Sequence, residues 1–155
     1  MSMSAKLKAL GFELPEAPAP VANYVPFTIS GNLLTISGQV SRMPSGAMLA
    51  GHVGGSATPE EGRRAAEVAA LNVIAQIAAA TGGEIAAVGR ILRLGVFVAS
   101  TPDFTGQPQV ANGASDLIAA VFGEAGRHAR AAVGVAALPG GAMVEVEATV
   151  ELVRR

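Results

Sequence analysis

Arg130 is the side chain whose type and setting most strongly suggest chemistry. It opens a predicted strand of small residues, 131–138, at the end of a loop that follows a helix. A planar guanidinium can hold a carboxylate through two parallel hydrogen bonds, and a hydrogen bond to a charged group contributes roughly 1.5–3 kcal/mol. Two interpretations stay open at this point: a receptor for a ligand carboxylate, or a surface ion pair worth about 1 kcal/mol at most.

Glu145 and Glu147 are the other candidates for chemistry. They lie two residues apart in the last predicted strand, so they point to the same face of a sheet. On a solvated face both would be ordinary exposed carboxylates. If another subunit closes that face, one of them becomes a candidate general base or a group that positions water.

Other catalytic chemistries find little support. His52 and His128 lie in Gly-rich or turn-like segments and have no neighbouring ligand at metal spacing, so no metal site is expected. The absence of cysteine excludes disulfides, thiolate zinc sites and cysteine nucleophiles. The glycines form no dinucleotide or phosphate loop. Ser37 has no obvious His/Asp pair to activate it, which argues against a serine hydrolase.

The composition limits the fold and the partners. The chain has 155 residues, of which 50% are hydrophobic and only 4% aromatic, so we expect one domain with a core of small aliphatic side chains. Such side chains bury little area each, at roughly 25 cal/mol per Å², which favours further burial between subunits. The formal net charge of −1, without a large Lys/Arg cluster, argues against nucleic-acid binding.

No secretory signal or membrane span is expected. Residues 1–14 lack a long apolar core. The Ala-rich stretch 68–80 is shorter than a bilayer span and is interrupted by Asn72 and Gln76. Together with the absence of cysteine, these features predict a cytoplasmic protein.

The chain divides into a lead-in, residues 1–21, and a main domain, residues 22–155. Three prolines within the lead-in enforce an extended path after one or two helical turns over 4–10. Two β-rich runs, 24–29 and 32–38, flank a hairpin turn at Gly31. A Gly-rich loop over 41–56 follows them.

The remaining pattern predicts two helices and three strands. Thr58 caps a helix that ends at Gly82, and a second helix spans 109–122. Strands are expected over 88–99, 131–138 and 143–153. Along the first of these, strict alternation would place Ile91 on the same side as Arg93, Gly95, Phe97 and Ala99. The predicted fold is α+β, and its helix-free sheet face must meet water, a ligand or other subunits.

Four segments resemble the Rid (YjgF) family and occur in its order: GNLLTISGQV (31–40), LRLGVFVAS (92–100), ARAAVGVAALP (129–139) and VEVEATVEL (144–152). The resemblance covers roughly residues 22–153. Its most specific part is the arginine-led strand followed by Leu-Pro, a turn and Val-Glu-Val-Glu-Ala.

This resemblance implies a chorismate-mutase-like fold, with two helices on one face of a mixed β-sheet. It also implies a homotrimer whose sheets pack into a central barrel, with ligand clefts at the subunit interfaces. Catalytic members hydrolyse enamines and imines such as 2-aminoacrylate to a 2-oxo acid and ammonia, without a cofactor. The implied partners are other copies of the chain and a small carboxylate metabolite, without metal, membrane or nucleic acid.

The resemblance also implies roles for individual residues. By motif position, Arg130 holds the substrate carboxylate and Glu145 lies near the attacking water. Five further positions would contact the substrate, the last of them through its backbone: Tyr24, Ser37, Gly38, Asn112 and Ala132.

Two departures from the common pattern are typical of a divergent branch. The chain is longer, with a Pro-rich start and the Gly-rich loop, and Arg127-His128-Ala129 stands where a proline often precedes the arginine. Three functional hypotheses therefore stay open. They are a hydrolase acting as an enamine/imine deaminase, a non-catalytic protein that binds small carboxylates or regulates a partner, and an endoribonuclease or translation inhibitor.

Overall fold

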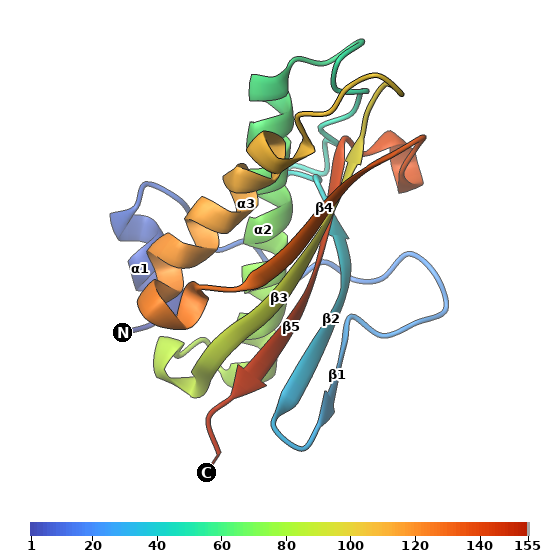
Figure 1. Ribbon diagram of the computed structural model, residues 1–155. Helices are drawn as coiled ribbons and strands as arrows, with labels where there is room; N and C mark the ends of the chain where they lie inside the picture. Colours follow the sequence, from blue (N-terminus) through green and yellow to red (C-terminus); the bar gives the residue numbers. More distant parts are fainter. Residues whose placement is uncertain (155) are drawn as a thin grey trace.

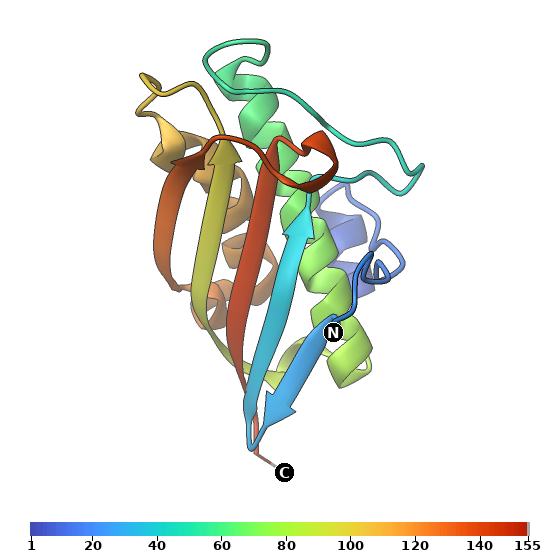
Figure 2. The same ribbon diagram turned by 90° about the vertical axis from the view of Figure 1, so that its right-hand side faces the viewer.

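The structure is a five-stranded mixed sheet with helices packed on one of its faces (Figures 1 and 2). A computed structural model describes residues 1–154. The elements are α1 (Met3–Ala9), β1 (Phe27–Ser30), β2 (Leu33–Val40), α2 (Pro59–Thr81), η1 (Ile85–Ala87), β3 (Val88–Ala99), α3 (Gln107–Phe122), η2 (Gly123–Gly126), β4 (Ala129–Val135), η3 (Pro139–Gly141) and β5 (Val144–Leu152). This order confirms the predicted α+β class.

The strand order is β1-β2-β5-β3-β4, so β1 and β4 form the two edges of the sheet. The β3–β4 pair is parallel, and the β1–β2, β2–β5 and β3–β5 pairs are antiparallel. Figure 2 looks onto the face that the helices leave uncovered. Side chains on that face are therefore available to a ligand or to another molecule.

A capping box fixes the start of the long helix α2, and a glycine in a left-handed conformation ends it. The Thr58 hydroxyl accepts a hydrogen bond from the Glu61 backbone N–H, and the Glu61 carboxylate accepts one from the Thr58 N–H. This reciprocal pair satisfies two N–H groups that a helix start leaves unpaired. Gly82 ends the helix with φ of 78°, a left-handed conformation that suits glycine. The predicted boundaries of this helix are confirmed.

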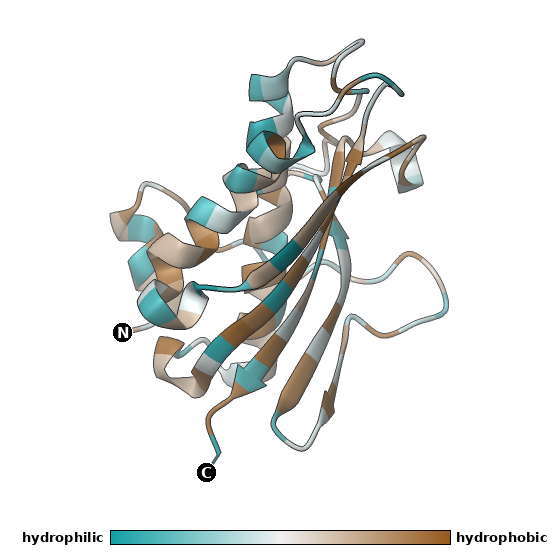
Figure 3. Cartoon of the chain, in the orientation of Figure 1, coloured by the Kyte–Doolittle hydropathy of each residue, from teal (hydrophilic) through white to brown (hydrophobic). Residues whose placement is uncertain are grey.

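Small residues allow α2 and α3 to pack closely against each other. A Cβ on Gly113 of α3 would collide with the backbone carbonyl group of Arg63 in α2. The core between the helices and the sheet consists mainly of Ala, Val, Ile and Leu, as the composition predicts. In Figure 3, hydrophobic and hydrophilic residues alternate along β3 and β5, so the core-facing and helix-free sides of these strands differ clearly.

Strict alternation fails at two places in β3, where its pairing with β5 shifts register: between Val88 and Arg90 and between Ile91 and Arg93. The second irregularity places Ile91 in the core, fully buried together with Leu94, because an extra residue in one strand reverses the faces beyond it. The prediction that Ile91 shares a face with Arg93 is therefore wrong.

The strand that carries Arg130 is shorter and begins earlier than predicted. β4 spans Ala129–Val135, so Arg130 is the second residue of the strand and does not lie in the loop before it. The backbone of Arg130 pairs in register with Leu94 of β3. This pairing fixes the face to which the arginine side chain points.

The lead-in packs against the rest of the chain. Met3 and Leu7 of α1 are fully buried, and the Met3 N–H donates to the Gly83 carbonyl at 2.8 Å. Farther along, the buried amide of Gln76 donates to the Pro18 carbonyl at 2.8 Å. The division of the chain into residues 1–21 and 22–155 stays a prediction. Arg155, the last residue of the predicted main domain, lies outside the described residues. Across residues 1–154, no helix combines the length and the apolarity needed to cross a bilayer.

Candidate ligand-binding site

The guanidinium of Arg130 is held against helix α3 by three hydrogen bonds. Its Nη1 donates to Asn112 Oδ1 at 2.8 Å and to Ser115 Oγ at 3.1 Å. Its Nη2 donates to the Pro108 carbonyl at 3.3 Å. Asn112 and Ser115 are three residues apart, so they lie side by side on one face of the helix. Arg130 is thus fixed in one orientation.

These bonds leave Arg130 with donors to spare. A guanidinium has five N–H groups, and three of them are used by Asn112, Ser115 and Pro108. Within residues 1–154, no carboxylate lies at ion-pair distance from Arg130. The intramolecular ion pair considered from the sequence is therefore not formed in the described chain. The Nε–H and one Nη2–H remain for an external acceptor.

His128 extends this cluster by one further residue. Its Nε2 lies 2.8 Å from Ser115 Oγ, and its Nδ1 lies 2.6 Å from the Gly126 carbonyl oxygen. From the sequence, His128 was considered as a metal ligand and as a replacement for a proline, but not as a partner of Arg130, and Ser115 was not singled out. The sole signal for Ser115 was its three-residue spacing from Asn112 on a predicted helix.

Glu145 lines a separate cavity of about 720 Å³ beside the end of β2, which Asn72 of α2 also lines. Tyr24 and Gly38, both predicted from the sequence, line the same cavity. Pro18–Ala22, from the lead-in, and Arg42, from the Gly-rich loop, also line it. Neither of these last two was predicted, because their approach depends on long-range packing that periodicity does not reveal.

Gly38 is required beside Glu145 for a steric reason. A Cβ at position 38 would overlap the Glu145 carboxyl group, with only 2.8 Å to its Cδ. Burial raises the pKa of Glu145 above its ordinary value of 4.5, and the negative charge of Glu147 raises it further. A carboxylate with a raised pKa is a stronger base, so this residue is suited to accept a proton.

Ser37 and Tyr24 are linked through the backbone. The Ser37 hydroxyl donates to the Val25 carbonyl at 2.8 Å, and the Ser37 N–H donates to the Pro26 carbonyl at 2.9 Å. Ser37 thereby ties the segment that follows Tyr24 to strand β2. Ser37 is not among the residues that line the Glu145 cavity, so within one chain it supports the cavity from outside.

The seven predicted site residues form two groups, one around Arg130 and one around Glu145, and these two side chains lie on opposite faces of the sheet. Arg130 pairs with Leu94 of β3, whose side chain is in the core, whereas Glu145 pairs with Phe97, three residues farther along. An odd separation along a strand places side chains on opposite faces. Ala132 pairs with Val96 and so belongs with Arg130 and Asn112. Tyr24, Ser37 and Gly38 belong with Glu145.

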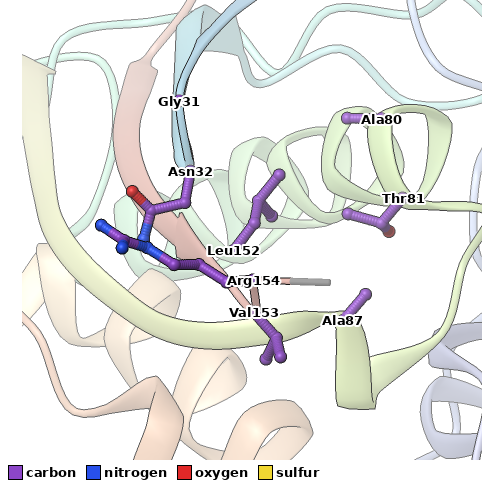
Figure 4. Close-up of a pocket in the computed structure, with 8 residues that line it drawn as sticks. All are labelled: Gly31, Asn32, Ala80, Thr81, Ala87, Leu152, Val153 and Arg154. Carbon is purple, nitrogen blue, oxygen red and sulfur yellow. The ribbon is translucent and has the colours of Figure 1, made fainter.

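A second cavity, also of about 720 Å³, lies at the opposite end of the sheet (Figure 4). It lies between the β1–β2 turn, the end of α2 and the end of β5. None of the predicted site residues lines it, and its lining includes no carboxylate: Gly31, Asn32, Ala80, Thr81, Ala87, Leu152, Val153 and Arg154. The first cavity is therefore the better candidate for acid–base chemistry.

The described residues do not assemble a metal centre. No group of three or more His, Cys, Asp or Glu side chains within residues 1–154 is placed to hold an ion. His52 instead makes a hydrogen bond at 2.7 Å to the Ala136 carbonyl.

Comparisons with known proteins show which family the chain resembles. The family described as "YjgF/chorismate_mutase-like, putative endoribonuclease" matches residues 4–152. Protein TCP17 of Trypanosoma cruzi is 52% identical over 151 residues, which cover 97% of this chain and 94% of that protein.

Two solved structures show how far the similarity extends. Atu1372 of Agrobacterium tumefaciens, a protein of unknown function, is 50% identical with a TM-score of 0.90, over 98% of this chain and 94% of the other. The structure of TdcF from E. coli with bound serine is 25% identical with a TM-score of 0.64, over 88% and 93%. The fold is thus chorismate-mutase-like, and the chain belongs to the YjgF/Rid family.

Proposed function

We propose that the protein is an enamine/imine deaminase that works as a homotrimer, with ligand sites between subunits. The observation that carries this proposal is the fixed guanidinium of Arg130, which retains two N–H donors and has no carboxylate partner within residues 1–154. Two such donors match the two oxygens of a ligand carboxylate. The proposed ligand is a small imino or 2-oxo acid.

The positions of Arg130 and Glu145 support a site shared between copies. Within one chain the two side chains lie on opposite faces of the sheet, so one chain cannot direct both at one small molecule. β4 is an edge strand, and Glu145 lies on the helix-free face. The edge of one copy can therefore approach the open face of the next, as a cyclic trimer requires.

The proposed reaction needs positioning more than strong activation. An iminium carbon is already electrophilic, so a held water molecule can attack it. The water oxygen forms a bond to this carbon, the carbon–nitrogen bond breaks, and both water protons end on the departing nitrogen. An iminium acid and water thus give a 2-oxo acid and ammonium. An enamine such as 2-aminoacrylate first takes a proton from solvent at its terminal carbon and becomes the iminium.

In this reaction Arg130 would orient the substrate carboxylate, and Glu145, with a backbone carbonyl, would hold the water. The raised pKa of Glu145 supports its role, because it can take a proton from the attacking water and pass it to the nitrogen. Tyr24 and Gly38 would contact the substrate from the Glu145 side. Asn112 and the backbone of Ala132 would do so from the Arg130 side. The scheme uses no cofactor.

The relative TdcF supports a small polar ligand. Its crystal structure contains serine, which carries an α-carboxylate like the one proposed for the substrate here. The description of the family also includes endoribonuclease activity. The net charge of −1 on this chain gives phosphate binding little electrostatic support, so we place the metabolite proposal ahead of ribonuclease activity.

A coupled assay tests the proposal directly. A dehydratase generates 2-aminoacrylate from serine, and the rate of 2-oxo acid and ammonia release is measured with and without this protein. Faster release that Arg130→Ala abolishes, in a variant that keeps its oligomeric state, supports the proposal. Release no faster than in buffer contradicts catalysis. Calorimetric binding of a 2-oxo acid without turnover would then support the non-catalytic binding protein.

A further inference from the structure

Arg130 is the last residue in a series of hydrogen bonds that begins at His128 and passes through Ser115. A carbonyl oxygen only accepts hydrogen bonds, so the 2.6 Å contact with Gly126 requires the proton of His128 to be on Nδ1. In a neutral imidazole the other nitrogen, Nε2, is then an acceptor. The network therefore assigns the tautomer of His128.

This tautomer sets the direction of the next hydrogen bond. With a neutral His128, the Ser115 hydroxyl donates its only proton to His128 Nε2, 2.8 Å away. Its oxygen lone pairs then face the remaining neighbour, and they accept the Nη1–H of Arg130 at 3.1 Å. In this series of hydrogen bonds, Ser115 therefore donates to His128 and accepts from Arg130.

We infer that Ser115 and His128 are positioning residues for Arg130. They hold the Nη1 edge of the guanidinium against α3, so that its Nε–H and one Nη2–H point outward as a fork for a ligand carboxylate. Asn112 Oδ1 and the Pro108 carbonyl hold the same group from the helix. A guanidinium held in place loses less side-chain entropy when a ligand binds.

The same contacts argue against a nucleophilic role for Ser115. A hydroxyl paired with a histidine resembles the start of a serine-hydrolase dyad. Here, however, the oxygen already accepts a hydrogen bond from a cation, which makes it less nucleophilic. The pair therefore holds Arg130, and does not attack a substrate.

This inference deepens the proposed function and rests on the carboxylate-binding role of Arg130. The test compares wild type with Ser115→Ala, Ser115→Thr, His128→Leu and His128→Gln. Calorimetry measures the Kd for pyruvate, and the coupled assay measures KM and kcat. The matched control is His52→Gln, which removes a histidine with a backbone hydrogen bond elsewhere.

We expect Ser115→Ala to raise the Kd and KM roughly tenfold, as loss of a hydrogen bond to a charged group does. The kcat should change less than about twofold, since the reacting atoms are untouched. His128→Leu should act in the same direction. Ser115→Thr and His128→Gln, which keep a hydroxyl and an acceptor, should restore most of the affinity, and His52→Gln should behave like wild type.

The outcomes separate this inference from the proposed function. Pyruvate affinity equal to wild type in both Ser115→Ala and His128→Leu overturns the inference and leaves the deaminase proposal intact. A fall in kcat with unchanged KM also overturns it. Weakened binding in these variants, without turnover by any protein, supports the inference and contradicts catalysis. A wild type that binds no 2-oxo acid overturns both.

Discussion

Arg130 and Glu145 of one chain point away from each other, on opposite faces of the sheet. Their backbones pair with Leu94 and Phe97 of β3, and the three-residue step between these partners accounts for the opposite directions. The two residues expected to perform the chemistry are therefore separated by the sheet itself. A shared site requires that they come from different copies.

Arg130→Lys should weaken 2-oxo acid binding roughly 10- to 100-fold. The ammonium of lysine keeps the charge but lacks the planar fork, and it cannot match both Asn112 and a bidentate carboxylate. Calorimetry with pyruvate measures the effect. The control is Arg127→Lys, whose side chain is exposed and pairs only loosely with Glu124 at 3.7 Å. Equal affinity in the Arg130 variant and this control would remove Arg130 from the site.

Glu145→Gln should lower kcat about 100-fold or more and change pyruvate affinity little, because the carboxylate acts on water and not on the ligand carboxylate. In the wild type, activity should fall on the acid side through a pKa above 4.5, the ordinary value, since protonated Glu145 cannot act as a base. The pH profile of kcat is the measurement. A flat acid limb, or a variant as active as wild type, speaks against the proposed base.

The raised pKa of Glu145 also has a consequence for stability. Above pH 4.5 the folded protein holds a proton that the unfolded chain has released, so the stabilisation from this group is lost as the pH rises through the folded-state pKa. Glu145→Gln removes this loss. Thermal unfolding between pH 4 and 8 should show the variant gaining stability relative to wild type as pH rises. A constant difference in Tm across this range would contradict a raised pKa.

Much of the fold could be predicted because its signals are local. The cap at Thr58, the break at Gly82 and the alternation of β5 each depend on neighbouring residues, and the structure confirms all three. The position of Ile91 was mispredicted because a β-irregularity depends on pairing with another strand. The Ser115–His128 contact was missed for a similar reason, since α3 and the loop after it must first pack together.

The sequence predicted the residues of the site as two separate groups, but not how these groups lie relative to each other. Motif positions identified Tyr24, Gly38 and Glu145, which share a cavity, and Arg130 with Asn112, which share a hydrogen bond. No pattern in the sequence indicates that Arg130 and Glu145 lie on opposite faces, because the face of β4 depends on its register with β3. Nor does periodicity predict that the lead-in lines the Glu145 cavity.

Gly38→Ala should disrupt the Glu145 side of the site. The added methyl would occupy the space of the Glu145 carboxyl group, which must then move. We expect kcat to fall at least about tenfold, because a displacement of 1 Å in a catalytic group has large effects. The control is Gly89→Ala, another strand glycine. Its added Cβ would come no closer than 3.3 Å to any other atom, so it would not overlap a neighbour as the Cβ at position 38 does. Equal activity in both variants would contradict this account of Gly38.

The lead-in should contribute to stability. Leu7→Ala should lower the free energy of unfolding by roughly 2–5 kcal/mol, because Leu7 is fully buried. Leu10→Ala should change it by less than about 1 kcal/mol, since Leu10 is 39% exposed. Urea denaturation measures both. If Leu7→Ala unfolds at the same urea concentration as wild type, the lead-in is independent of the main domain, as a division at residue 21 would have it.

Subunit mixing tests the central claim most directly. Arg130→Ala and Glu145→Gln chains, each inactive alone, are co-expressed with different tags, and assemblies that carry both tags are purified. If one copy supplies Arg130 and the next supplies Glu145, every cyclic trimer that holds both kinds of chain has one intact site out of three, so the purified mixed assemblies should retain about a third of the wild-type sites. The account predicts recovered deaminase activity near that level. Mixed assemblies as inactive as the two parents, or a chain that stays monomeric, would contradict it.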